Sequence, residues 1–154
     1  MKIVKDLEIE KWSDFVFNNP KGNIFQTPEM FHVYMNTRNF KPMVMGVVDN
    51  NNEIKALLVS HTIRESIIGP LSTRTILQGG PIYENSPSGL KALNKLLSEY
   101  VKTMRTKTIF TEVRNLWDVR DVHEIFSIHG FTFEDHLNFL LDLEKSKEEL
   151  WKGL

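Results

Sequence analysis

The sequence predicts an α/β fold, a mixed sheet with helices on both of its faces. Extended apolar runs in the middle of the chain follow one another with only short turns between them, which is typical of an antiparallel meander. Helical stretches precede this meander, and helical and extended stretches alternate after it. The predicted element order is β-α-α-β-β-β-α-β-α-β, and a further helix begins near the end of the chain.

A short strand and two helices come before the meander. Alternation over 2–7 predicts the strand. The first helix presents an apolar face of residues spaced three and four apart: Ile9, Trp12, Phe15 and Val16. Turn-forming residues at 18–22 end this helix. Thr27 is expected to cap the second helix, because Pro28 then takes the first position, where a missing N–H costs no hydrogen bond.

The remaining strands are expected at five places in the chain: 43–49, 54–65, 71–83, 107–114 and 131–143. A tight turn at 50–53 joins the first two of them. The third contains Gly79 and Gly80, and glycines inside a strand indicate a bulge or the close approach of another group to the backbone.

Helices are expected between and after these later strands. The strongest follows the loop 84–89 and has apolar residues at helical spacing: Leu90, Leu93, Leu97, Val101 and Met104. A shorter helix over 119–129 ends at Gly130. Ser146 and Glu149 form the pattern of a capping box. We expect one domain over 1–145, with 146–154 beginning a helix that leads to a second domain.

The composition is that of a globular protein and excludes several classes of function. The chain has 154 residues, enough for one core of ordinary size. Its 19 basic and 20 acidic side chains give a formal charge of −1, so no broad basic surface for DNA or anionic lipid is expected. Cysteine is absent, which excludes disulfides and thiolate metal sites. No apolar run is long enough for a membrane span, and a cytoplasmic location is expected.

The predicted element order is that of the acyl-CoA N-acyltransferase (GNAT) fold. In an active GNAT enzyme, the loop before the long helix presents backbone N–H groups to the pyrophosphate of CoA. Here that loop is 84–89, in which Pro87 lacks a donor and Glu84 adds negative charge. The sequence therefore disfavours acetyl-CoA as a cofactor of this domain. The spacing of the five histidines predicts no metal site.

Two histidines lie in predicted strands. His61 is surrounded in the sequence by apolar residues that share its strand face, so it is expected to be a hydrogen-bonded core histidine. His136 belongs to a polar group over 133–138, for which a solvated edge strand and a polar ligand site both remain open.

Arginines end two of the predicted strands. Arg64 ends one, and Arg114 followed by Asn115 ends another. A half-buried arginine needs a partner, so these side chains either form internal ion pairs or hold an anion. Open sheets bind ligands near the carboxyl ends of their strands, which favours Arg114 and Asn115 as residues of a cleft.

Four short segments carry a family resemblance: 25–30 (FQTPEM), 79–82 (GGPI), 109–114 (IFTEVR) and 141–150 (LDLEKSKEEL). They are similar, in order, to an F-x-Q entry into the second helix, an R-G-P-V strand, an f-l-R-i strand and the segment before R-x-x-I-R-x-A. These motifs resemble the N-terminal domain of the Fem-type (FemAB-like) aminoacyltransferases, the methicillin-resistance factors that build the interpeptide bridges of peptidoglycan.

The resemblance implies that this chain is the acceptor-binding half of an N-acyl- or aminoacyltransferase. Members of the family pair two GNAT-like domains and transfer an amino acid from aminoacyl-tRNA to the amine of a cell-wall precursor. Their first domain contributes to precursor binding and lacks the CoA loop. The partners implied are therefore an amine acceptor, either a small molecule or a cell-wall precursor, and a C-terminal domain through which aminoacyl-tRNA would bind.

The resemblance also suggests roles for individual residues. Glu84 corresponds to an acidic residue that faces the acceptor, and would hold its ammonium group. Arg38 would replace a basic residue that contacts diphosphate in some members. Gln26 belongs to the first motif. The candidate substrate-binding set also includes the residues singled out above: Arg64, Arg114, Asn115 and His136.

Two other functions remain open at this point. The chain is alternatively a non-catalytic binding or interaction module that presents an exposed sheet edge. The third reading is a small CoA-dependent GNAT acetyltransferase with an atypical loop. No catalytic residue is assigned under any of the three.

Overall fold

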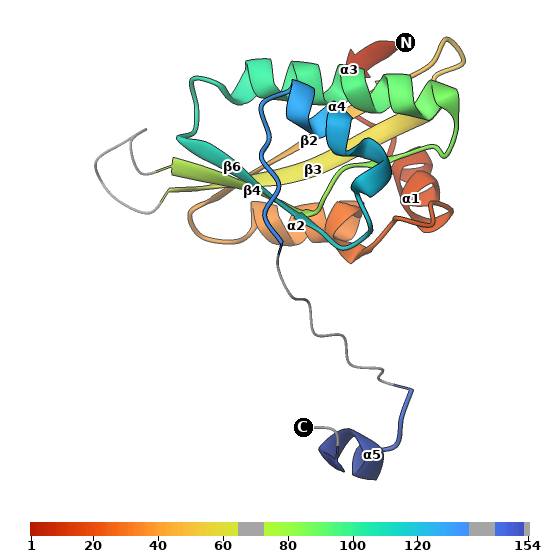
Figure 1. Ribbon diagram of the computed structural model, residues 1–154, viewed down its shortest axis with the longest axis vertical. Coiled ribbons are helices and arrows are strands. Elements are labelled where there is room, and N and C mark those ends of the chain that lie inside the picture. The colour runs from red at the N-terminus through yellow and green to blue at the C-terminus, as the bar shows by residue number, and fades with distance from the viewer. Residues whose placement is uncertain (65–72, 136–143, 153–154) are drawn as a thin grey trace.

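The computed structural model describes residues 1–64, 73–135 and 144–152. They include a six-stranded sheet with α1 and α2 on one face and α3 and α4 on the other (Figure 1). The strands are β1 (Lys2–Val4), β2 (Phe40–Val48), β3 (Ile54–Arg64), β4 (Thr73–Gly79), β5 (Ile82–Tyr83) and β6 (Phe110–Asn115). The helices are α1 (Ile9–Phe17), α2 (Pro28–Met35), α3 (Pro87–Met104), α4 (His123–Ile128) and α5 (Lys147–Lys152), with short 3₁₀ turns at Ile24–Gln26 and Arg120–Val122.

The sheet is mixed, as the sequence predicts. Its strand order is β1-β2-β3-β4-β6, and β5 pairs with β3 alone. Strands β1 to β4 are antiparallel neighbours, whereas β6 runs parallel to β4. A parallel pair needs a crossover, and α3 provides it by passing over one face of the sheet between β5 and β6.

Two predicted strands differ from the structure. The prediction of one strand over 71–83 is wrong, because β4 ends at Gly79 and β5 begins only at Ile82. No strand is present over 131–135, and the rest of the predicted segment 131–143 lies outside the described residues, as do residues 65, 71 and 72.

Two predicted helix starts, those of α2 and α5, are confirmed by their caps. The Thr27 hydroxyl accepts a hydrogen bond from the backbone N–H of Met30 at 3.2 Å. At the start of α5, Ser146 and Glu149 form the reciprocal capping box. The long helix begins earlier than predicted, because Ser86 caps it and Pro87 is its first residue. The second half of the predicted loop 84–89 is therefore helical.

Each face of the sheet has its own apolar core. Leu93, Leu96, Leu97 and Tyr100 of α3 are fully buried on one face. Trp12 of α1 and Tyr34 of α2 are buried on the other. The spacing of the apolar residues in α3 explains its burial, since they form a single stripe along an 18-residue helix.

His61 is a core residue, but its environment differs from the prediction. Its ring stacks on that of Phe40 with centroids 4.6 Å apart and packs against Tyr34 at 4.4 Å. Its Nδ1 atom is buried and has no hydrogen-bond partner among the described residues. Burial lowers the pKa of His61, and the positive charge of Arg114 acts in the same direction. Ring stacking therefore holds this histidine where the sequence predicts a hydrogen bond.

Candidate functional site

The sheet splits at the end of β4. Strands β4 and β6 pair in parallel as far as Gly79 and Asn115. The chain then turns through Gly80, whose φ of 71°, like the 83° of Gly79, lies in the left-handed region that favours glycine. Beyond this turn Tyr83 of β5 pairs with β3 and no longer follows β6. We call the turn at 79–81 the sheet split.

Gln26 holds the sheet split in place. Its Nε2 atom donates hydrogen bonds to the carbonyl oxygens of Gly79 at 3.0 Å and Gly80 at 2.9 Å. Its Oε1 atom accepts a hydrogen bond from the backbone N–H of Asn23. The side chain is fully buried, so these contacts use it as a structural residue. The close approach to the backbone that the two glycines indicate is therefore confirmed, and the approaching group belongs to this chain.

The loop between α1 and the first 3₁₀ turn is attached to β5. The Nδ2 atom of Asn19 donates to the carbonyl oxygen of Tyr83 at 2.9 Å, and its Oδ1 atom accepts from the backbone N–H of Lys21. These bonds place Lys21 beside two aromatic rings. Its Nζ atom lies 3.9 Å from the ring centroid of Tyr83 and 4.9 Å from that of Trp117.

Two buried polar atoms lie beside Gly80 without a hydrogen-bond partner among the described residues. One is the Oδ1 atom of Asn115, and the other is the Nε1 atom of Trp117. A Cβ atom on Gly80 would lie 2.2 Å from the first and 3.6 Å from the second. An acceptor and a donor that both lack a partner therefore lie together at the sheet split. This geometry favours a ligand or water that satisfies them.

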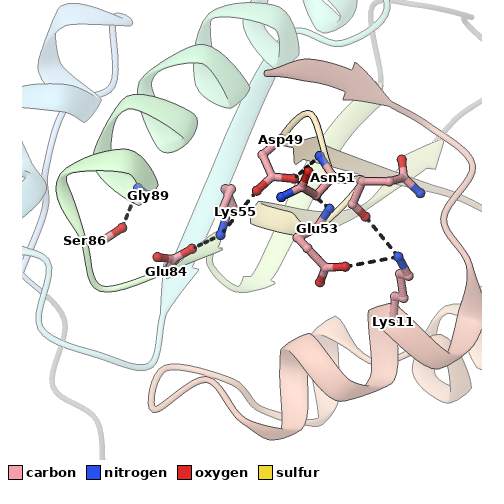
Figure 2. Close-up of polar contacts among 9 residues, drawn as sticks. Lys11, Asp49, Asn51, Glu53, Lys55, Glu84, Ser86 and Gly89 are labelled. Atoms are coloured by element: carbon pink, nitrogen blue, oxygen red, sulfur yellow. Dashed lines mark hydrogen bonds and ion pairs between the residues drawn. The ribbon is translucent and has the colours of Figure 1, made fainter.

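A second polar group follows β5. The Nζ atom of Lys55 lies 2.6 Å from Glu84 Oε2 and 3.6 Å from Asp49 Oδ2, and Figure 2 shows it between the two carboxylates. We call Asp49, Lys55 and Glu84 the ion cluster. The hydrogen bond from Lys55 lowers the pKa of Glu84, and the same contact raises the pKa of Lys55. The ion cluster is half-exposed, so solvent screens it.

The segment 84–89 does not fit the pyrophosphate of CoA. The Ser86 hydroxyl accepts the backbone N–H of Gly89 at 3.0 Å, which uses one donor of the α3 N-terminus, as Figure 2 shows. Pro87 supplies no N–H. The Glu84 carboxylate precedes the same turn and would repel phosphate groups. These residues reduce the number of N–H donors at this terminus and place a negative charge beside it, which disfavours an anion there.

The structure separates the predicted site residues into two groups. Gln26, Glu84 and Asn115 come together around the sheet split and β5. Arg64 lies at the opposite end of the sheet, where it pairs with Thr73, about 20 Å along β4 from Gly79. Arg38 precedes β2 at that same distant end.

Arg114 and His136 complete the predicted set. The Nε atom of Arg114 donates to Glu112 Oε1 at 2.7 Å, so an internal ion pair is formed, as one of the two sequence-based alternatives states. The side chains of Glu112 and Arg114 line an open cavity of about 1220 Å³ along β6. His136 lies outside the described residues. Substrate binding by any residue of the predicted set stays a prediction.

Lys21, Tyr83 and Trp117 are absent from the set of residues predicted from the sequence. They come from three segments far apart in the chain, and no spacing rule links them. Only the turn signal around Gly22 and the glycines before β5 indicate that these segments have special backbone geometry.

The described residues contain neither a helix that could span a membrane nor a metal-ligating cluster. No helix in this part of the chain has both the length and the apolar character needed to cross a bilayer. The same residues contain no group of three or more side chains that would ligate a metal.

Comparison with known proteins identifies the fold. No protein-family model matches the sequence, and a search of curated proteins finds no match. Among solved structures, a transcriptional regulator from Bacillus halodurans is similar with a TM-score of 0.64, 12% identity and coverage of 91% of this chain and 99% of that one. An aminoglycoside 6'-N-acetyltransferase from Acinetobacter haemolyticus has a TM-score of 0.59 and 14% identity, with coverage of 92% of this chain and 98% of that one. A ribosomal-protein-alanine N-acetyltransferase from Brucella melitensis has a TM-score of 0.59 and 9% identity, with coverage of 93% of this chain and 100% of that one.

These similarities confirm the GNAT fold that the element order predicts. They extend over nearly the whole of each chain, and two of the three proteins are N-acetyltransferases by name. At such low identities the likeness concerns the fold, and function has to be argued from the site. The Fem-type resemblance stays a prediction.

Proposed function

We propose that this domain binds the amine acceptor of a Fem-like N-acyl- or aminoacyltransferase, and that the acyl donor binds on a second domain. The observation that carries the proposal is the N-terminus of α3, which offers few N–H donors and has Glu84 beside it. Ser86 and Pro87 remove donors that a CoA pyrophosphate needs, while the GNAT fold itself is retained. An acyltransferase fold without this anion site is suited to the acceptor side of the reaction.

The ion cluster supports a binding role for Glu84. Transfer to an amine requires that the acceptor be oriented and then lose a proton. Because Lys55 lowers the pKa of Glu84, this side chain is a carboxylate at neutral pH and a weak base. Glu84 is therefore suited to hold the acceptor's ammonium group in exchange for Lys55, and is poorly suited to remove its proton.

Arg114 is suited to the acceptor's anionic part. It is exposed on the cavity along β6, so an anion that enters the cavity can compete with Glu112 for its guanidinium group. The distance along the sheet separates Arg38 and Arg64 from this region, and we propose no joint role for them with Glu84.

A first experiment separates acceptor-side binding from CoA binding. Calorimetry of the wild-type protein with acetyl-CoA should show no binding tighter than about 1 mM, a free energy of about −4 kcal/mol. A micromolar dissociation constant, about −8 kcal/mol, would support the second candidate function, a small CoA-dependent acetyltransferase. The full-length likeness to N-acetyltransferases is the observation that favours this second candidate.

A second experiment tests the two binding residues. The probe is Nα-acetyl-L-lysine, which carries one ammonium and one carboxylate group. In an NMR titration, Glu84→Gln and Arg114→Ala should each weaken binding about fivefold or more, since each removes one charge partner. Lys102→Ala, on the exposed side of α3, is the control and should bind like the wild type. Unchanged affinity in both test variants would sink the proposal.

A further inference from the structure

We infer that Tyr83 and Trp117 form a binding site for a primary ammonium group, and that Lys21 occupies this site in place of the ligand. The inference rests on the proposed function in one respect, namely that the ligand is an amine acceptor. It adds a second ammonium site, distinct from the one proposed at Glu84, and the chemical class of the molecule that binds there.

The geometry around Lys21 is that of a cation held by aromatic rings. Its Nζ atom lies 3.9 Å from the Tyr83 centroid and 4.9 Å from the Trp117 centroid, both within the range of a cation–π contact. The two rings meet edge to face, with centroids 5.8 Å apart and planes at 66°. Tyr83 is only 4% exposed, whereas Lys21 and Trp117 are half-buried, so one of the two rings is shielded from water.

The two rings are the partners of Lys21 within the described residues. No carboxylate in that part of the chain lies within ion-pair distance of its Nζ atom, whereas Lys11 and Lys55 both have such partners. A lysine that served only solubility or helix stability would extend into water. The position of the Lys21 ammonium therefore reports the preference of the rings for a cation.

Lys21 can leave the rings without disturbing the fold. Its loop is held by backbone and asparagine contacts, among them the bond from Asn19 to Tyr83. None of these bonds uses the lysine side chain. The four-carbon stem is flexible, and the residue is half-buried. An external ammonium group can therefore replace the internal one while the loop stays in place.

The two partnerless atoms beside Gly80 define the rest of the ligand. Trp117 presents its ring to the cation and its Nε1–H at the sheet split, where Asn115 Oδ1 lies close by. A peptide-like amide has the complementary pair, a carbonyl oxygen for the indole and an N–H for the asparagine. The ligand class is thus a primary amine on a short apolar stem attached to an amide, as in a lysine- or ornithine-like residue of a peptide.

The test empties the rings and measures what enters. The probe is Nα-acetyl-L-lysine N-methylamide, and the control ligand is the norleucine analogue, which lacks the ammonium group. Binding is followed by the NMR signal of the Trp117 indole N–H, assigned with Trp117→Phe. Lys21→Met retains the apolar stem and removes the charge, Lys21→Gln is a second way to empty the site, and Lys91→Met on the exposed side of α3 is the control variant.

The wild type should bind the lysine probe weakly, in the millimolar range, with a shift of the Trp117 signal. Lys21→Met and Lys21→Gln should bind it about tenfold more tightly, because the internal competitor is gone. Lys91→Met should match the wild type, and the norleucine analogue should bind none of the proteins. Equal affinity of the Lys21 variants and the wild type, equal binding of the two ligands, or an unmoved Trp117 signal would each overturn the inference.

These outcomes can be separated from those of the proposed function. One outcome is that Nα-acetyl-L-lysine binds the wild type and binds Glu84→Gln more weakly, while the Lys21 variants bind the N-methylamide probe no more tightly than the wild type. In that case the acceptor-binding role stands and the ammonium site at Tyr83 and Trp117 is wrong. If the wild type instead binds acetyl-CoA in the micromolar range, the proposed function fails. The comparison of the Lys21 variants with the wild type still decides the ammonium site.

Discussion

The sheet split and the ion cluster lie on either side of Tyr83, yet they are held by opposite kinds of interaction. At the sheet split, the neutral amide of Gln26 is fully buried and bonded to two carbonyl groups. In the ion cluster, charged side chains meet at a half-exposed surface. Buried neutral bonds are costly to lose because their partners remain without water, whereas exposed charges are rehydrated when a partner is removed.

This difference indicates that the sheet split and the ion cluster have different roles. The sheet split fixes backbone geometry and should dominate stability. The ion cluster and the contact of the Lys21 ammonium group with the adjacent aromatic rings contribute little to stability, so their charges can be exchanged for those of a ligand. Three substitutions test this difference in roles, and we order them by the size of the expected effect.

Gln26→Leu should be the most destabilising of the three. It removes three hydrogen bonds and leaves the carbonyl groups of Gly79 and Gly80 buried without a donor. We expect a loss of about 3 kcal/mol in the free energy of unfolding, measured with urea. Gln78→Leu is the control, because that half-buried amide has no hydrogen bond to the described residues. Similar losses in both variants would contradict a special role for Gln26.

Gly80→Ala should have an intermediate effect with two separable parts. The left-handed backbone conformation costs a residue with a Cβ about 1–2 kcal/mol. The contact with Asn115 adds to this, since the new Cβ would lie 2.2 Å from its Oδ1 atom. Gly130→Ala isolates the first part, because its φ is 82° and a Cβ there would meet nothing within 4 Å. We expect the free energy of unfolding, measured by thermal denaturation, to fall by about 1 kcal/mol more in Gly80→Ala than in Gly130→Ala. Equal losses would show that Asn115 moves away freely.

Glu84→Gln should have the smallest effect on stability, below about 1 kcal/mol at pH 7 after solvent screening. Its pH dependence has a definite sign. Lys55 lowers the pKa of Glu84 from its ordinary value of 4.5. The stabilisation is therefore complete above that value and is lost as the pH falls through the lower pKa of the folded protein. Urea unfolding of wild type and variant at pH 7 and pH 3 should show the difference shrinking with acidity. A difference that grows at pH 3 would contradict the ion pair.

Most of the architecture follows from local patterns in the sequence. The apolar stripe of α3 and the Thr27 cap of α2 each depend on residues within one or two helical turns. Both are confirmed, except that Leu90 at the start of the predicted stripe is exposed. The prediction of one strand over 71–83 is wrong for a physical reason. Its apolar pattern continues through Gly79 and Gly80, whereas the pairing with β6 ends at Gly79 and the pairing with β3 resumes only at Ile82. His61 differs for a similar reason, because the ring of Phe40 comes from another strand.

The candidate site is less accessible to sequence reasoning. Gln26, Glu84 and Asn115 are predicted as site residues and do gather around β5, but the sequence does not indicate that Gln26 is used internally. Lys21 and Trp117 carry no local signal, because an ammonium–ring contact depends on distance in space and on no fixed spacing in the chain.

The sequence by itself determined the order of helices and strands as far as α4, apart from the division of β4 from β5. It also determined the caps of α2 and α5 and the presence of Pro87 and Glu84 in the segment where a CoA enzyme needs donors. These properties depend on backbone propensity and on neighbours in the chain, so they can be deduced from the order of residues alone. Only the tertiary structure decided that β4 divides from β5, that Gln26 holds the division, and that Lys21 lies over Tyr83 and Trp117. Each of these depends on packing between distant segments, where burial and geometry determine which polar atoms have partners.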